Sequence, residues 1–167
     1  MGEKLGRLLS RRNLESNHRM ISIGGLFYCW TSRRFFFVLR GPECPRPNTW
    51  GLVGGKLEHG ETLINGLHRE ISEEIGYLPD IAKTIPIDTY ENNGQSFKYY
   101  TWLLIIDKEF IPQLNYENQG YAWVSFNGWP KPLHPGLYAS FNEELFKQKI
   151  STIIDLDFSQ ILYSTQQ

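Results

Sequence analysis

The sequence has few cysteines and no large excess of charge of either sign. Only Cys29 and Cys44 occur among 167 residues, and neither has a CxxC partner or a nearby histidine cluster, which argues against zinc and favours two free thiols. Lys and Arg number 17 and Asp and Glu 18, so the formal net charge is -1. This balance argues against binding of nucleic acid or membrane surfaces by bulk electrostatics. A phosphate ligand would have to be held locally.

Long apolar runs are also absent. Leu103–Ile106 is far shorter than the roughly 20 residues of a membrane helix, and Met1–Lys4 carries no apolar signal segment. We therefore expect a cytoplasmic protein without membrane association.

The length and composition allow one substantial core. With 41% hydrophobic and 14% aromatic residues, 167 residues are enough for one globular domain and would be cramped for two. Residues 1–19, which include Arg7, Arg11 and Arg12 beside several leucines, are expected to form a basic arm or short helix. Residues 20–167 are expected to form the domain itself.

Apolar runs alternate with turn residues along this domain. The predicted strands are Met20–Thr31, Phe35–Arg40, Trp50–Gly55, Ile85–Glu91, Phe97–Asp107 and Tyr121–Phe126. The predicted helices are Glu61–Ile75, with Gly76 as its C-terminal cap, and Tyr138–Lys149. Short polar turns connect Met20–Thr31 with Phe35–Arg40 and Ile85–Glu91 with Phe97–Asp107, which predicts two hairpins. Strands on both sides of a central helix predict an α+β fold with a mixed sheet covered by helices.

The central predicted helix carries a cluster of carboxylates. Glu70, Glu73 and Glu74 fall on one margin of its apolar face at about 100° per residue, where their mutual repulsion would be offset by a hard divalent cation. Gly66 lies on the same margin one turn earlier, and we expect it to leave a bare surface for metal and phosphate. Three glutamates on a helix are otherwise most often a solvated face.

The surrounding residues favour the metal site. The run from Gly55 to Tyr77 matches the pattern Gly-x5-Glu-x7-Arg-Glu-U-x-Glu-Glu-x-Gly-U, where U is bulky and apolar. This run resembles the Nudix box of MutT-like Nudix hydrolases. The filled positions are Gly55, Glu61, Arg69, Glu70, Glu73, Glu74 and Gly76. At roughly 7% per residue type, these seven positions would coincide by chance on the order of once in a million chains of this size.

The resemblance implies a fold, a cofactor and a chemistry. The fold would be a Nudix-type α/β/α sandwich, and the cofactor Mg²⁺ or Mn²⁺. The implied metal ligands are Glu70, Glu73 and Glu74, together with the carbonyl of Gly54. Glu61 and Arg69 would form a structural pair, and Lys56 would face the phosphates. The implied reaction is substitution at phosphorus by an activated water, so that a pyrophosphohydrolase cleaves a nucleoside diphosphate linked to another moiety.

A general base must accept the proton of that water. Glu70 and Glu73 are candidates within the box. Glu117 is a third, and a further metal ligand, because it precedes the strand that carries Trp123 by six residues, a spacing similar to a recurring feature of the family. Glu109 is the competing choice.

The substrate is less constrained than the chemistry. Phe27 and Trp50 are candidates for stacking on a base, although aromatic residues in strands more often belong to the core. For His134 a loop or capping role is preferred. The compact frame favours a nucleoside triphosphate, including an oxidised deoxynucleotide, or a nucleotide sugar. The alternatives are ADP-ribose, a dinucleoside polyphosphate, or a module that senses a nucleotide without cleaving it. The protein is expected to be a monomer or homodimer.

Overall fold

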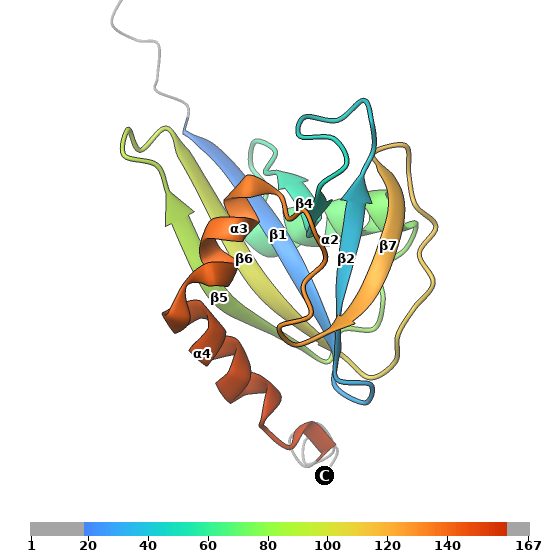
Figure 1. Ribbon diagram of the computed structural model, residues 1–167. Coiled ribbons are helices and arrows are strands. Elements are labelled where there is room, and N and C mark those ends of the chain that lie inside the picture. The colour runs from blue at the N-terminus through green and yellow to red at the C-terminus, as the bar shows by residue number, and fades with distance from the viewer. Residues whose placement is uncertain (1–18, 160–167) are drawn as a thin grey trace, which may run out of the picture.

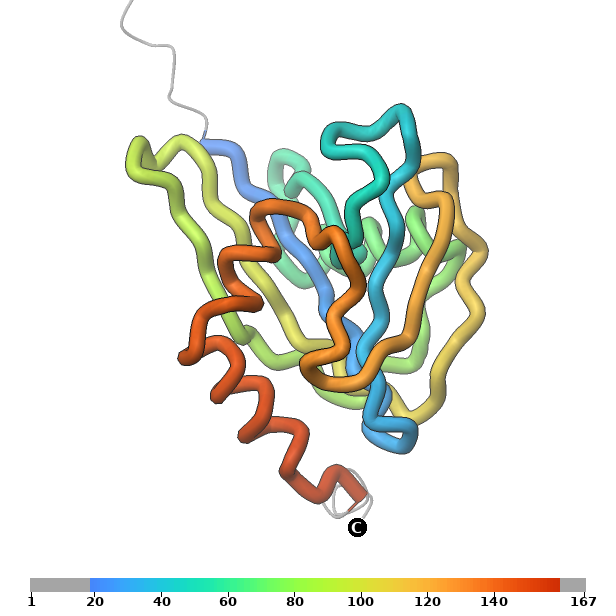
Figure 2. Tube along the Cα trace, in the orientation of Figure 1, coloured from blue at the N-terminus to red at the C-terminus, as the bar shows by residue number. Residues whose placement is uncertain are grey.

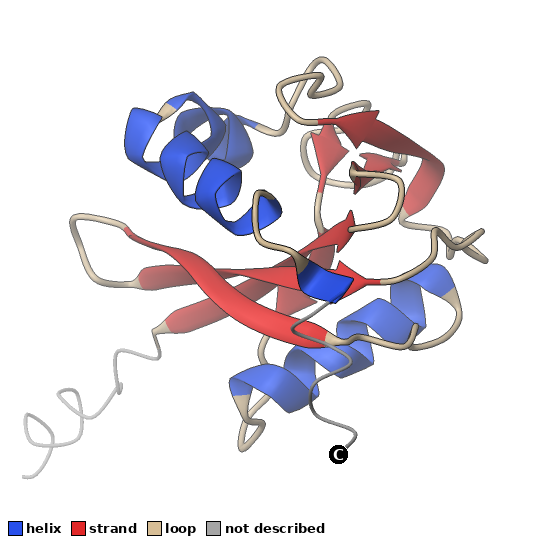
Figure 3. Cartoon of the chain, turned by 90° about the horizontal axis from the view of Figure 1, so that it is seen from below, coloured by secondary structure: helices blue, strands red, loops and turns tan. Residues whose placement is uncertain are grey.

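A computed structural model describes residues 19–159. A mixed seven-stranded sheet lies between one helix on one face and two helices on the other, which confirms the predicted α+β sandwich (Figures 1 and 3). The strands are β1 (Met20–Cys29), β2 (Arg34–Arg40), β3 (Trp50–Gly51), β4 (Val53–Lys56), β5 (Lys83–Glu91), β6 (Phe97–Ile106) and β7 (Asn118–Ser125). The helices are α2 (Leu63–Ile75), α3 (Pro135–Asn142) and α4 (Glu144–Ile154). Apart from residue 19, the predicted N-terminal arm lies outside the described residues.

Strand β1 is the centre of the sheet. It pairs in parallel with β6 along its whole length, from Met20 opposite Phe97 to Cys29 opposite Ile106. On its other edge, its first half pairs with β4 and its last residues pair with β2, both antiparallel. The two predicted hairpins, β1–β2 and β5–β6, are confirmed.

The predicted strand Trp50–Gly55 is two short strands with different partners. β3 pairs with β2, whereas β4 pairs with β1. The chain therefore crosses from one part of the sheet to another at Leu52, and the edge of β4 that faces away from β1 is left for the residues of the site.

Alternation along the strands produces two apolar layers. Ile23 and Phe27 of β1 face α2, where they pack with Leu67, Ile71 and Ile75. The alternate β1 residues, Leu26 and Tyr28, face the other layer. That layer contains Phe35 and Phe37 of β2 and Leu137, Phe141, Phe146 and Ile150 of the last two helices. Apolar residues spaced by helical turns on α2 thus pack against apolar residues at alternate positions of β1.

Both ends of α2 have caps that the sequence encodes. Thr62 Oγ1 accepts the backbone N–H of Asn65 at 3.2 Å, so the helix begins at Leu63 and the predicted first residue, Glu61, stays in the preceding loop. Gly76 has a left-handed φ of 87°, and its N–H donates to the carbonyl of Ser72. The predicted C-terminal cap is confirmed.

The single predicted helix Tyr138–Lys149 is wrong. The chain forms two helices, α3 and α4, that meet at Glu143, whose ψ of 129° is extended. Asn142 Nδ2 donates to the carbonyl of Tyr138 at 2.6 Å, and such side-chain bonds compete with a continuing helical ladder. The bend lets Phe141 and Phe146 reach the same layer, with ring centroids 4.9 Å apart.

Two smaller findings concern the thiols and the membrane. Cys29 and Cys44 are both free, as predicted. Among residues 19–159, none of the helices has the length and apolar character needed to cross a bilayer.

Candidate active site

Glu74 lies in the gap between β4 and β7. Its side chain comes from the last turn of α2 and the residue is only 4% exposed. One carboxylate oxygen accepts the backbone N–H of Gly54 at 2.8 Å, and the other accepts Asn118 Nδ2 at 2.7 Å. Burial raises the pKa of Glu74 to about 8; the two hydrogen bonds oppose this shift, and the nearby Glu117 and Glu70 add to it.

Two glycines of β4 permit close contacts, Gly54 with the backbone of β1 and Gly55 with the carboxylate of Glu70. Gly54 has a φ of 149°, and a Cβ there would lie 2.1 Å from the carbonyl oxygen of Ile23. A Cβ on Gly55 would lie 2.5 Å from Glu70 Oε1. Since real Cβ atoms do not come this close to other atoms, any larger residue would displace either the strand or Glu70.

Arg69 ties the loop before α2 to the helix. Its guanidinium donates to both carboxylate oxygens of Glu61, at 2.8 and 3.0 Å. The same group donates to Glu70 at 2.8 Å, to Glu73 at 3.3 Å and to the carbonyl of Lys56 at 3.0 Å. The hydrogen bonds from Arg69, with a smaller contribution from the backbone N–H of Glu58, lower the pKa of Glu61 to about 2. Glu61 and Arg69 therefore meet as the box pattern implied.

The other predicted acids differ in burial and in their electrostatic influence on Glu74. Burial raises the pKa of Glu70, Arg69 opposes the rise, and Glu73 and Glu117 strengthen it. Glu117 is therefore within electrostatic range of both Glu70 and Glu74. The side chain of Glu73 is 55% exposed and stands further out.

The position of Glu117 is fixed through its backbone. Its N–H donates to Asn115 Oδ1 at 3.0 Å, and its carbonyl accepts the N–H of Gly41 at 2.7 Å. The N–H of Asn115 in turn donates to the carbonyl of Glu74. The loops before β7 and after β2 thus hold Glu117 beside the end of α2.

The donor set fits a hard divalent cation. All the clustered side-chain donors are carboxylate oxygens, the ligands that Mg²⁺ prefers, and a buried acid beside two others needs positive charge when it ionises. Within residues 19–159, no three carboxylate, imidazole or thiol groups already converge as a metal-holding group. Arg69 engages Glu70 and Glu73 in this arrangement, so those side chains would have to turn toward a bound ion.

The three residues predicted to bind substrate differ in exposure. Lys56 is exposed at the end of β4, on the strand that carries Gly54. Trp50 is half-buried. Its backbone N–H donates to the carbonyl of Pro132, and its carbonyl accepts the N–H of His134, each at 2.8 Å. Phe27 is fully buried between Phe36 and Phe110 under α2. It has no exposed ring face for a base, so its predicted role in substrate binding is wrong.

Gly66 also differs from its prediction. A Cβ there would lie 2.7 Å from Leu57 Cδ1 and 3.1 Å from Ile23 Cδ1. The glycine therefore allows close packing of α2 on the loop and the sheet and leaves no bare surface for a metal.

Two further expectations from the sequence can be placed. Glu109 forms a bidentate pair with Arg34 at 2.7 and 2.6 Å, which engages its carboxylate away from the acid cluster. His134 caps α3, since its Nδ1 accepts the N–H of Gly136. The capping role is confirmed.

The sequence interpretation did not identify Asn118 or Tyr99. Asn118 is 8% exposed, and its side-chain amide donates to Glu74; its only signal in the sequence was its position directly after Glu117. The Tyr99 hydroxyl lies over Gly24 of β1, where a Cβ would be 2.0 Å from it. The parallel register of β1 and β6 creates this contact, and no local pattern indicates it.

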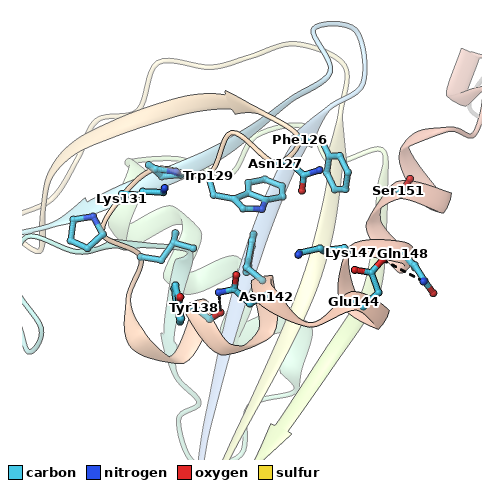
Figure 4. A pocket seen from close by; sticks show the side chains of 14 residues that line it. Phe126, Asn127, Trp129, Lys131, Tyr138, Asn142, Glu144, Lys147, Gln148 and Ser151 are labelled. Atoms are coloured by element: carbon cyan, nitrogen blue, oxygen red, sulfur yellow. Dashed lines mark hydrogen bonds between the residues drawn. The ribbon is translucent and has the colours of Figure 1, made fainter.

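A large groove lies elsewhere among the described residues. A space of about 950 Å³ opens between α3, α4 and the segment that joins β7 to α3, which the tube in Figure 2 follows past the helices. Trp129, Lys131 and Lys147 are among its walls (Figure 4). None of the acids of α2 lines it, so size alone does not identify the reactive site.

Known proteins resemble this chain in sequence and in fold. A nucleoside triphosphatase NudI from Salmonella paratyphi B is 36% identical over 88 residues, which span 47% of this chain and 62% of that protein. The MutT protein from Methanosarcina mazei Go1 has a TM-score of 0.58 at 25% identity, over 80% of this chain and 94% of its own. The Nudix hydrolase RenU from M. smegmatis has a TM-score of 0.64 at 21% identity, over 84% and 89% of the two chains.

A family model also matches the chain. It begins at the first residue of β1, includes the whole glutamate helix and reaches the start of α4. Because the NUDIX domain model matches residues 20–144, three quarters of the chain, this protein belongs to the NUDIX domain family.

Proposed function

We propose that this protein is a metal-dependent pyrophosphohydrolase that cleaves a nucleoside triphosphate, oxidised deoxynucleotides included, or a nucleotide sugar. The observation that carries the proposal is Glu74, a nearly buried acid placed between β4 and β7 with Glu70 and Glu117 beside it. The name of the NudI relative as a nucleoside triphosphatase supports the triphosphate.

Glu70, Glu74 and Glu117 would hold the metal, with Glu73 and the carbonyl of Gly54 as further ligands. Bound Mg²⁺ or Mn²⁺ would supply positive charge at the diphosphate and ease the ionisation of water. Such a set of oxygen donors is typical of magnesium sites that act on phosphates.

The protein's own groups then have separate tasks. Glu117, Glu70 or Glu73 accepts the proton as the water oxygen bonds to phosphorus and the bond to the bridging oxygen breaks. Arg69 orients Glu70 and keeps the loop of Glu61 against the helix. Lys56 faces the phosphates from the end of β4. Positioning and charge stabilisation account for most of the rate.

A substrate panel tests the proposed function. Purified protein is incubated with Mg²⁺ and nucleoside triphosphates, oxidised deoxynucleoside triphosphates, nucleotide sugars, ADP-ribose and dinucleoside polyphosphates. Turnover should be highest for a triphosphate or a nucleotide sugar and should stop when EDTA removes the metal. Tight binding of a nucleotide without turnover of any compound would instead identify a nucleotide-sensing module.

Glu74→Gln tests the residue that carries the proposal. The substitution keeps the shape of the side chain, and Asn118 can turn its amide to accept from the new one, so we expect the fold to persist. Turnover should fall by on the order of a thousandfold because one charged ligand is lost. Glu58→Gln, in the exposed loop before the helix, should retain normal turnover. Near-normal activity of Glu74→Gln would rule out the assigned site.

A further inference from the structure

The Tyr99 hydroxyl occupies a space that only glycine leaves on β1. An ideal Cβ on Gly24 would lie 2.0 Å from this oxygen and 2.8 Å from the ring carbon that carries it. Gly24 is the register partner of Gly54, whose N–H donates to Glu74. The Tyr99 hydroxyl therefore lies over the β1 residue that pairs with Gly54, and the N–H of Gly54 binds the buried carboxylate of Glu74.

Charged groups of both signs influence Tyr99. Burial raises its pKa, Glu74 raises it further, and Arg40 lowers it. The phenol is thus within electrostatic range of Glu74 and of Arg40. Arg40 donates through Nε to the carbonyl of Pro45 at 2.8 Å, which orients the guanidinium and leaves its terminal nitrogens for another acceptor.

The hydroxyl makes no hydrogen bond to any other residue in the described part of the chain, although the residue is half-buried. The hydroxyl is not among the fully buried polar atoms that lack a partner, so it can be reached from solvent and is free to donate to a ligand. The neighbouring Tyr100 points to the opposite face, where it packs in the layer under α2. Of the two tyrosines, only Tyr99 faces the side of the sheet on which Gly24 lacks a side chain.

We propose that Tyr99 is a substrate-binding residue whose hydroxyl donates to a phosphate oxygen of the nucleotide, between the carboxylates and Arg40. This inference rests on the proposed function and narrows it, since the ligand must place a phosphate group over Gly24. A phosphate oxygen is an acceptor only, which suits a protonated phenol, and its charge strengthens the bond.

Binding in EDTA separates this contact from turnover. ATP and dGTP are titrated into wild type, Tyr99→Phe and the matched control Tyr100→Phe by calorimetry, with adenosine and deoxyguanosine as ligands that lack phosphate. Tyr99→Phe should bind the triphosphates about tenfold more weakly and the nucleosides unchanged, while Tyr100→Phe should match wild type. The KM measured with Mg²⁺ should rise by a similar factor in Tyr99→Phe alone.

Several results would overturn the assignment. Wild-type affinity and KM in Tyr99→Phe would do so, and so would an equal loss for nucleosides and triphosphates, which would indicate a role in the base pocket or in folding. Thermal unfolding monitors the fold of each variant. If Tyr99→Phe unfolds, Arg40→Gln replaces it, and a loss confined to triphosphates is again the expected result.

The two proposals fail separately. Triphosphate binding that depends on Tyr99 without turnover in Mg²⁺ would remove the enzyme and keep the subsite. Normal turnover with an unchanged KM in Tyr99→Phe would keep the enzyme and remove the subsite.

Discussion

At the scale of single residues, Arg69 joins three parts of the box. It bonds Glu61 in the loop, the carbonyl of Lys56 at the end of β4 and Glu70 on the helix. The planar guanidinium matches the two carboxylate oxygens of Glu61, a geometry that lysine cannot reproduce. The contacts that hold the loop, β4 and α2 together are therefore partly ion pairs, so their contribution to stability depends on pH.

The Glu61–Arg69 pair predicts a specific acid response. The pKa of Glu61 is lowered in the folded state from about 4.5 to about 2, so its contribution to stability is complete above pH 4.5 and is lost as the pH falls toward 2. Glu61→Gln should be less stable than wild type at pH 7, and the difference should shrink on acidification through this window. The free energy of unfolding in urea, measured from pH 7 to pH 2.5, checks this. Glu58→Gln is the control, and a difference that is constant with pH would contradict the prediction.

At the scale of elements, the site is the place where β4, α2 and β7 come together. The helix contributes Glu74, β4 the N–H of Gly54 and β7 the amide of Asn118. The remaining helices support the opposite face of the sheet, and their stability depends on a few large side chains.

Packing of α4 predicts a contrast between neighbours. Phe146 is 3% exposed and Leu145 is 63% exposed. Phe146→Ala should lower the free energy of unfolding by about 3 to 5 kcal/mol, whereas Leu145→Ala should change it by less than about 0.5 kcal/mol. Urea unfolding of the two variants measures the contrast. Equal effects would show that α4 is not anchored through Phe146.

The sequence predicted local features better than those that depend on tertiary structure. The Gly76 cap and the two hairpins follow from patterns within one segment, and the pairing of Arg69 with Glu61 was implied by the resemblance to the Nudix box. The burial of Phe27 and the packing of Gly66 against Leu57 depend on which face meets the sheet, and both were misjudged. Tyr99 over Gly24 and Asn118 beside Glu74 need the register of strands that are distant in sequence, which no single segment encodes.

At the scale of the whole molecule, metal binding and folding should be coupled. An ion that binds the native acids but not the unfolded chain stabilises the fold by about 2.7 kcal/mol at one hundred times its Kd. We expect Mg²⁺ to raise the urea midpoint of wild type and of Glu58→Gln. Glu74→Gln should gain much less. An equal gain in all three proteins would mean that Mg²⁺ stabilises them without using the acid cluster.

The parallel pairing of β1 with β6 also determines when the site can form. A chain that has been synthesised only as far as Tyr77 already contains every residue of the Nudix box. One edge of β1 is still open at that stage, because Phe97–Ile106 has not been made, and Asn118 comes later still. Closing so long a loop is slow relative to forming local hairpins. The acids on α2 are therefore among the earlier residues to leave the ribosome, and their arrangement as a site is among the later events of folding.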